Sequence, residues 1–155
     1  MPGTARALYL MSGGWCSVER SFLTAGVGAA GERILTPIPM AVVDTRDGWV
    51  LFDTGMNCEG IHDPEGTWGE RAKMIQPRLL PEDDVRHRLG EVGVHLEDIR
   101  VVVNSHLHWD HCGGNRLFHH CPIVAQRAEM AFAREPTGLV AGGYMANHVA
   151  LPLKY

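Results

Sequence analysis

The string His106-Leu107-His108-Trp109-Asp110-His111 constrains this chain most, because it places three imidazoles and one carboxylate within six positions. It follows the apolar run Val101-Val102-Val103 almost directly. The nearly unbroken β-branched stretch Ile99 to Asn104 predicts a strand buried on both faces. The cluster therefore lies just beyond the carboxyl end of a buried strand, where α/β sheets usually carry their sites.

The spacing within the string predicts a metal site. In an extended segment His106 and His108 point to the same side, so two imidazoles can converge on one ion. We expect Gly113-Gly114 to let the loop turn, so that Asp110 and His111 face a second position. Imidazole and carboxylate suit zinc or another first-row divalent ion. Such a string arises by chance only roughly once in a thousand chains of this composition, so coincidence is the weaker interpretation.

The remaining pattern alternates strands with helices and predicts an α/β (α+β) fold. Met56 to Pro81 is irregular and predicts a long loop that covers a site, with Trp68 in it as either core or lid. Start and stop signals and apolar spacing predict two helices, at Pro81–Val92 and Arg127–Arg134. Further strands are predicted at Arg6–Met11, at Pro39–Asp44 and Trp49–Asp53 as a hairpin turning at Arg46-Asp47-Gly48, and at Ile123–Ala125.

Composition indicates one soluble globular domain over residues 1–155, with 45% hydrophobic and 21% charged residues. A net charge of -4 without a basic stripe argues against a nucleic-acid binder. The apolar stretch Ala7–Met11 is too short for a signal peptide or membrane span, which predicts no membrane and a cytoplasmic location. The four cysteines form no Cys-x-x-Cys pair, so reduced thiols are expected, with Cys112 as a buried packing residue rather than a ligand.

With these residues in view, the chain resembles the metallo-β-lactamase superfamily, and within it the quorum-quenching N-acyl homoserine lactone lactonases. The resemblance rests on Ser105–Asn115, on Phe52-Asp53-Thr54-Gly55-Met56 and on Gln126-Arg127-Ala128-Glu129. It implies a metallo-β-lactamase-like αββα sandwich that carries two metal ions, normally two Zn²⁺, with a bridging hydroxide. It also implies a hydrolase that acts on a small-molecule lactone.

The resemblance also implies roles for individual residues. His106 and His108 bind the first metal, Asp110 and His111 bind the second, and Asp53 supports the ligands from behind. A metal-bound hydroxide attacks the lactone carbonyl, and Asp110 accepts or relays a proton as the ring oxygen leaves. The acyl tail needs an apolar groove, for which the candidates are Trp109, Met40 and Trp68.

This chain departs from the family pattern after His111. The family supplies a further histidine, a bridging aspartate and a last histidine from a second half. Here only His119, His120 and His148 follow, no aspartate follows Asp110, and the chain finishes in the apolar run Val149–Leu153 before Lys154-Tyr155. We therefore hypothesise that this is the N-terminal half of a lactonase, which leaves a sheet face without its covering layer.

Three alternatives stay open. Other hydrolases of the superfamily act on thioesters or β-lactams and fit the same histidine string. A non-catalytic fragment that binds one metal weakly through His106 and His108 also fits; His148 is a possible third ligand, although a surface histidine is the favoured interpretation. The segment Val50–Gly55 resembles the Asp-Thr-Gly of homodimeric aspartic proteases but leaves the histidines unexplained. The acyl-chain preference, the metal in the cell and the oligomeric state are not predicted.

Overall fold

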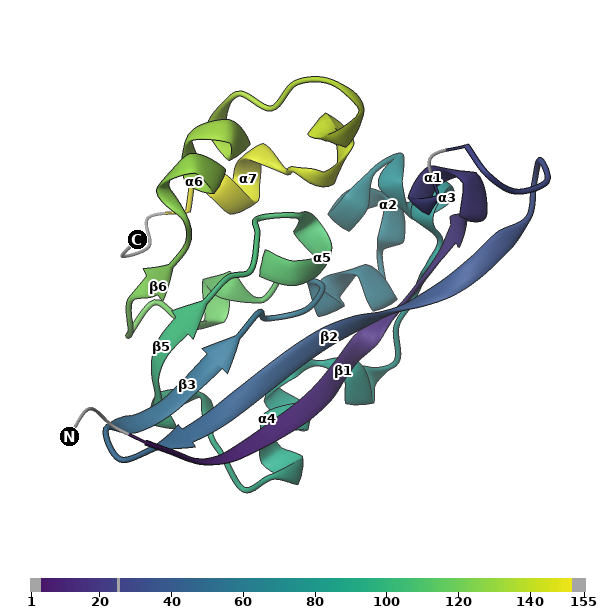
Figure 1. The fold of residues 1–155 in the computed structure, drawn as a ribbon. Helices are drawn as coiled ribbons and strands as arrows, with labels where there is room; N and C mark the ends of the chain where they lie inside the picture. The colour runs from purple at the N-terminus through teal and green to yellow at the C-terminus, as the bar shows by residue number, and fades with distance from the viewer. Residues whose placement is uncertain (1–3, 25, 152–155) are drawn as a thin grey trace.

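A six-stranded mixed sheet forms the scaffold of the computed structural model, which describes residues 4–24 and 26–151 (Figure 1). The strand order is β4-β1-β2-β3-β5-β6. The last part of the apolar run Val149–Leu153 and the end at Tyr155 lie outside the described residues. The strands are β1 (Ala5–Glu19), β2 (Arg33–Thr45), β3 (Gly48–Phe52), β4 (Pro77–Arg78), β5 (Ile99–Val103) and β6 (Ile123–Val124).

The strands combine an antiparallel half with a parallel half. The predicted hairpin is confirmed, since β2 and β3 pair antiparallel around the turn before Gly48, although β2 begins at Arg33 instead of Pro39. β1 pairs antiparallel with β2 and extends well beyond the predicted Arg6–Met11. β3, β5 and β6 run parallel to one another. The carboxyl ends of β3 and β5 therefore meet at one edge of the sheet.

Short helices connect these strands. The predicted helix Arg127–Arg134 is confirmed at both ends as α6. The predicted helix Pro81–Val92 is shorter, because Asp84 accepts a hydrogen bond from the Arg86 amide and becomes the N-cap. The α-helices are α1 (Arg20–Leu23), α2 (Pro64–Trp68), α3 (Arg71–Ile75), α4 (Val85–Glu91), α5 (Trp109–Cys112), α6 and α7 (Ala146–Val149); 3₁₀ turns lie at Cys58–Ile61, Pro81–Asp83, Leu96–Asp98, Asn115–Leu117 and Leu139–Gly143.

The segment Met56 to Pro81 is not the structureless loop that its composition predicts. It contains α2, α3, β4 and a 3₁₀ turn. Trp68 ends α2 and is buried, with 2% of its surface exposed, in a cluster with Ile38, Met56 and Trp109. The side chain is therefore part of the core and not a lid.

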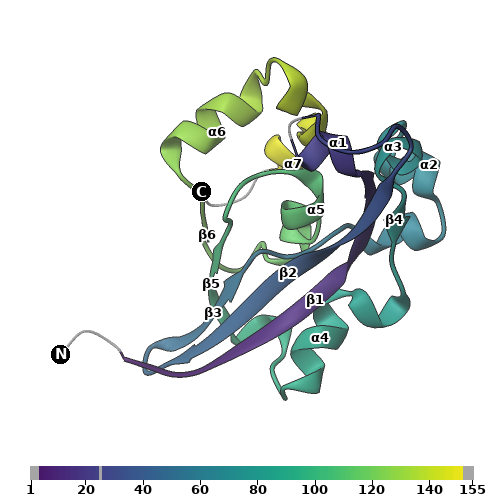
Figure 2. The ribbon, with the colours of Figure 1, turned by 45° about the vertical axis from the view of Figure 1, so that its right-hand side comes forward.

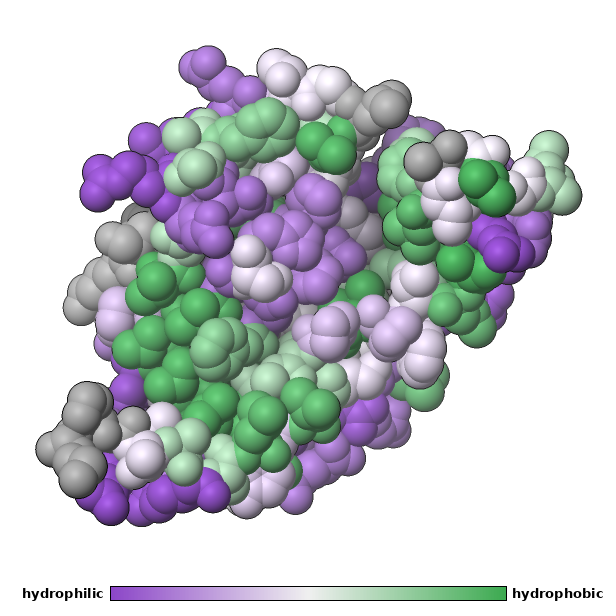
Figure 3. Space-filling view, in the orientation of Figure 1, coloured by the Kyte–Doolittle hydropathy of each residue, from purple (hydrophilic) through white to green (hydrophobic). Residues whose placement is uncertain are grey.

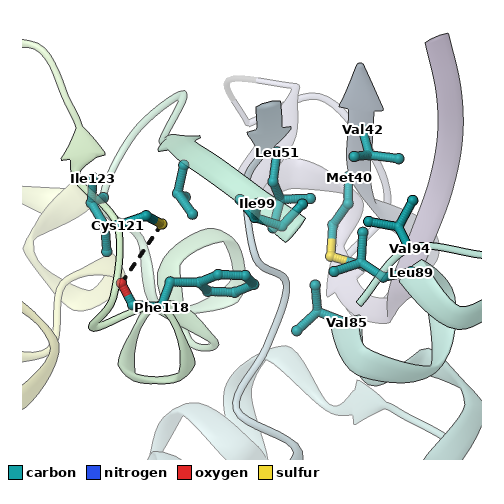
Figure 4. Close-up of a cluster of buried hydrophobic side chains, with 11 residues drawn as sticks. Met40, Val42, Leu51, Val85, Leu89, Val94, Ile99, Phe118, Cys121 and Ile123 are labelled. Atoms are coloured by element: carbon teal, nitrogen blue, oxygen red, sulfur yellow. Dashed lines mark hydrogen bonds between the residues drawn. The ribbon is translucent and has the colours of Figure 1, made fainter. Parts of the chain in front are cut away.

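One face of the sheet is covered by α4. Alternation along β2 and β3 turns Met40, Val42 and Leu51 toward Val85 and Leu89 of the helix, and Figure 4 shows these side chains in contact across the core. Phe118, Ile123 and the Cys121 thiol, which donates to the Phe118 carbonyl oxygen, extend the cluster under β5 and β6.

The opposite face of the sheet is apolar and open. Leu10, Phe52 and Val124 are 80%, 42% and 49% exposed, and the strand register aligns them in one row through Ala41 and Val103. Figure 3 shows this apolar area over the strands. The prediction that β5 is buried on both faces is wrong for the described residues, because Val103 is only partly covered. The prediction of an uncovered sheet face is confirmed for the same residues.

The helices α5, α6 and α7 gather beyond the carboxyl end of β5, on the side away from α4 (Figure 2). The described residues include no helix long and apolar enough to cross a membrane. Cys16, Cys58 and Cys112 are free thiols in the described structure.

Candidate metal centre

The histidine string lies where two parallel strands end side by side. Asp53 follows β3, and its amide donates a 3.0 Å hydrogen bond to the carbonyl oxygen of Val103, the last residue of β5. Ser105 and His106 follow two residues later. The histidine string therefore lies beyond the carboxyl end of a sheet strand, where such sheets usually carry their sites.

Three imidazoles converge at this edge. The ring centroids of His106 and His108 are 4.5 Å apart, and those of His106 and His111 are 4.2 Å apart. The backbone differs from the prediction, since His108 is the N-cap of α5, and Asp110 and His111 lie on that helix. His106 and His108 lie before the helix, where the backbone of His108 is extended, and the helical turn of α5 brings Asp110 and His111 to the same edge.

Asp53 organises two of the three rings. His111 Nδ1 lies 2.9 Å from Asp53 Oδ2, and because a carboxylate only accepts hydrogen bonds, Nδ1 carries the proton. Ser105 Oγ donates to the same oxygen at 2.7 Å and therefore accepts from His106 Nδ1 at 3.0 Å. Both rings are thus held in the tautomer that leaves Nε2 available as a metal ligand.

The backbone supports this arrangement. The Ser105 amide donates to Asp53 Oδ1 at 2.8 Å, so both carboxylate oxygens have partners. Asp53 has φ +56°, a left-handed conformation that is uncommon outside glycine and that Asp and Asn adopt more readily than other residues. Strain of this kind clusters at functional sites.

Burial and neighbouring charges set the protonation states. Burial raises the pKa of Asp53, but the hydrogen bonds from His111 and Ser105 outweigh it and lower the pKa below its usual value. Burial is the main cause that lowers the pKa of His106 and of His108. Burial also lowers the pKa of His111, but the hydrogen bond to Asp53 and the charge of Asp110 outweigh it and raise the pKa of that imidazole. Imidazoles with a lowered pKa are neutral at neutral pH, which is the form that binds metal ions.

The donor set fits a divalent ion in part. His111 Nε2 and Asp110 Oδ2 are 3.5 Å apart. Two donor atoms that each lie about 2.1 Å from one tetrahedral zinc ion are separated by about 3.4 Å, so the observed distance suits a shared ion. Among the residues that the structure describes, however, no three His, Cys, Asp or Glu side chains are arranged to hold an ion by themselves. The residues present therefore supply donors but no closed coordination shell.

The two glycines after the helix allow close packing of the backbone against the segment after β3. Gly113 and Gly114 have φ of -63° and -88°, so neither needs the freedom of glycine to turn, and that prediction is wrong. A Cβ on Gly113 would lie 2.4 Å from the Asn57 amide nitrogen, and one on Gly114 would lie 2.6 Å from the Thr54 carbonyl oxygen. They let α5 approach the segment after β3.

The three residues predicted to line a substrate groove are core residues. Met40, Trp68 and Trp109 expose 2%, 2% and 1% of their surface. Met40 packs under the sheet with Val42, and the rings of Trp68 and Trp109 are 5.5 Å apart. Side chains this deeply buried offer almost no surface to a substrate in the described structure, and the predicted substrate contact stays a prediction.

Two neighbours of the string were also predicted. Cys112 is the expected packing residue: its thiol donates to the Leu107 carbonyl oxygen at 3.4 Å, and burial raises its pKa to about 12. His148 is not a surface residue, because it is 7% exposed and its Nδ1 lies 3.7 Å from Cys112 Sγ.

Sequence reasoning missed three residues around the site. Ser105 opens the segment Ser105–Asn115 of the family resemblance, which is a signal for it, although no role was predicted for its side chain. Glu129 accepts a 2.7 Å hydrogen bond from the Leu107 amide, and Tyr144 places its ring 4.6 Å from that of His108. The segment Gln126–Glu129 belongs to the family resemblance, which is a signal for Glu129, whereas no pattern pointed to Tyr144.

Known proteins resemble the chain over most of its length. The sequence profile of the metallo-beta-lactamase superfamily matches residues 34–153. An N-acyl homoserine lactonase of Bacillus cereus is 35% identical over 134 residues, which are 84% of this chain and 52% of the relative. The N-acyl homoserine lactonase AttM of Rhizobium johnstonii is 31% identical over 94% of this chain and 55% of its own length. The chain thus spans about half the length of the curated relatives it matches.

Solved structures share the fold. An N-acyl homoserine lactone hydrolase with N-hexanoyl-L-homoserine at its catalytic metal centre aligns with TM-score 0.83 and 30% identity over 98% of this chain and 59% of that one. AiiA of B. thuringiensis with N-decanoyl-L-homoserine at the active site aligns with TM-score 0.84, 30% identity and the same coverage.

These matches overturn the aspartic protease alternative, which also fails because both Asp53 oxygens are engaged by Ser105 and His111. The fold, the histidine cluster and the profile match agree: the chain belongs to the metallo-β-lactamase superfamily.

Proposed function

We propose that this protein is a metal-dependent hydrolase that opens the lactone ring of N-acyl homoserine lactones. The observation that carries the proposal is the joined set of Asp53, Ser105, His106 and His111 in a chain about one third identical to proteins named as lactonases. The substrate is a small molecule. Because the sequence contains no Cys-x-x-Cys pair, we also propose a reducing compartment, the cytoplasm, as its place of action.

The metal that we propose is zinc, with two ions per complete site. His106 and His108 would hold one ion, and Asp110 and His111 the other. When bound, a zinc ion would lower the pKa of water to about 7 and polarise a carbonyl oxygen, which is the chemistry that ester hydrolysis needs.

The chain's own residues have separate tasks. Asp53 and Ser105 hold His106 and His111 in the tautomers that leave Nε2 free. Asp110, 20% exposed at its side chain, accepts a proton from the attacking water on a carboxylate oxygen. As the carbonyl carbon gains the water oxygen, the bond to the ring oxygen breaks and Asp110 returns the proton to that oxygen. The product is the N-acyl homoserine.

The test is a substrate panel on the purified chain with added Zn²⁺. N-hexanoyl homoserine lactone, a thioester and a β-lactam are compared by mass spectrometry, with and without a chelator. We expect chelator-sensitive opening of the lactone. The variant Asp110→Asn should remove it, while Asp47→Asn in the exposed turn before β3 should not. Preference for the thioester or β-lactam replaces the lactone assignment, and no turnover of any substrate favours the non-catalytic alternative.

A further inference from the structure

The ring of His108 is held differently from those of its neighbours. Among the described residues, His106 and His111 are fixed by hydrogen bonds to Ser105 and Asp53, whereas His108 makes ring contacts only. It also lacks a side-chain capping bond at the start of α5. Something other than a hydrogen bond must therefore set the orientation of this imidazole.

We propose that Gly143 and Tyr144 form a positioning wall that sets the orientation of His108, and that Glu129 and Arg71 hold this wall in place. The inference rests on the proposed function only in treating His108 as a metal ligand. The wall comes from the 3₁₀ turn Leu139–Gly143 and the residue after it, more than thirty positions beyond the histidine string.

The wall touches the imidazole at two points. A Cβ built on Gly143 would lie 2.5 Å from both Cδ2 and Nε2 of His108, so the backbone of Gly143 packs directly on the ring. The Tyr144 ring stands edge-on to it, with centroids 4.6 Å apart and an interplanar angle of 82°. Residues larger than glycine at position 143 would displace the imidazole, because the side chain gives way more easily than the backbone.

Two charged side chains anchor the wall. The Arg71 guanidinium donates to the carbonyl oxygens of Gly142 at 2.5 Å and of Tyr144 at 2.8 Å. Glu129 Oε1 accepts from the Tyr144 hydroxyl at 2.9 Å and from the Leu107 amide at 2.7 Å. One carboxylate oxygen therefore joins the wall to the residue between His106 and His108.

This arrangement explains the position of Glu129 on α6. Burial of Tyr144 and its hydrogen bond to Glu129 raise the pKa of the phenol to about 12, so the hydroxyl remains a donor at neutral pH. Removing a residue that holds a metal ligand in place typically lowers metal affinity 10- to 100-fold. We expect an effect of that size here.

The test compares two neighbouring glycines. Gly143→Ala forces a Cβ against His108, whereas Gly142→Ala is the matched control, because a Cβ there meets nothing within 4 Å. Two quantities are measured on the full chain: the imidazole ¹⁵N resonances of His108 without metal, and the affinity for Zn²⁺ by chelator competition. We expect Gly143→Ala to shift the His108 resonances and weaken Zn²⁺ binding at least 10-fold, and Gly142→Ala to change neither.

A second pair of variants covers the case in which Gly143→Ala does not fold. Glu129→Gln keeps an oxygen that accepts from Leu107 and Tyr144, whereas Glu129→Ala removes it. Shifted His108 resonances in Glu129→Ala with recovery in Glu129→Gln support the wall. Unchanged resonances in both Gly143→Ala and Glu129→Ala overturn it. If the parent chain binds no Zn²⁺, the proposed function fails for this chain, while the metal-free resonances still decide whether the wall positions His108.

Discussion

Asp53 and His111, 58 positions apart in the chain, are joined by a 2.9 Å hydrogen bond between Oδ2 and Nδ1. The bond connects the end of β3 with α5. Through it and through Ser105, one carboxylate orients His106 and His111, the first and last residues of the string. Because Ser105 Oγ donates to the same oxygen, loss of the carboxylate disturbs two rings at once.

The first prediction concerns this carboxylate. Asn tolerates the left-handed φ of +56° at position 53, so Asp53→Asn changes the charge and hydrogen-bond pattern with little backbone penalty. The amide group cannot accept from all three donors, and we expect Zn²⁺ affinity to fall about 10- to 100-fold. Chelator competition measures this, with Asp47→Asn as control. Equal Zn²⁺ affinity in Asp53→Asn and the parent would show that the carboxylate does not organise the ligands.

A second prediction concerns the buried polar network under the site. Thr54 Oγ1 donates to Asn115 Oδ1 at 3.0 Å and accepts from the Gly114 amide at 3.1 Å. Thr54→Val leaves the buried Gly114 amide without a partner and Asn115 Oδ1 with Asn104 Nδ2 as its remaining donor, which costs about 1–3 kcal/mol. We expect the free energy of unfolding in urea to fall by that amount. The exposed Thr137→Val serves as control and should stay within about 0.5 kcal/mol of the parent; equal stability of the two variants contradicts the assignment.

Local signals in the sequence predicted the elements whose ends are set by neighbouring residues. The helix Arg127–Arg134 and the hairpin before Asp53 were found from patterns of a few residues. The start of α4 was misplaced, because Asp84 rather than Pro81 caps the helix. The histidine string was found because its chemistry is concentrated in six positions.

Local sequence patterns do not predict contacts between segments that are distant in the chain. Met40 was assigned to a groove from its apolar character alone, whereas its burial depends on α4, which packs on the face that alternation gives to Met40 and Val42. The partnership of Glu129 with Leu107 and Tyr144 depends on where α6 and the turn before α7 fold back. No local sequence pattern predicts where these two segments fold back onto the site.

The third prediction separates core from lid at Trp68. Truncation of a fully buried tryptophan removes its packing and leaves a cavity, so Trp68→Ala should lower the free energy of unfolding by about 3–5 kcal/mol. The indole Nε1 has no hydrogen-bond partner in the described structure, so Trp68→Phe loses no such bond and should cost clearly less. Urea denaturation measures both. A lid would give the opposite pattern: unchanged stability and an altered KM for the lactone.

The last prediction uses the buried imidazole on α7. Burial, followed by the positive charges of Arg116 and Arg71, lowers the pKa of His148 from 6.5 to about 4. As the pH falls, the unfolded chain takes up this proton first. The contribution of neutral His148 to stability is therefore complete above about pH 6.5 and declines until about pH 4, by on the order of 3 kcal/mol.

The glutamine side chain in the variant His148→Gln does not titrate. Comparing the parent with this variant therefore separates the effect of His148 from that of all other titratable groups. The difference in unfolding free energy between parent and variant should shrink by about 3 kcal/mol from pH 7 to pH 4. His62→Gln, at an exposed position, serves as the control substitution. A constant difference between parent and His148→Gln across this range would mean that His148 is hydrated in the folded chain, and that α7 does not pack over Cys112 in solution.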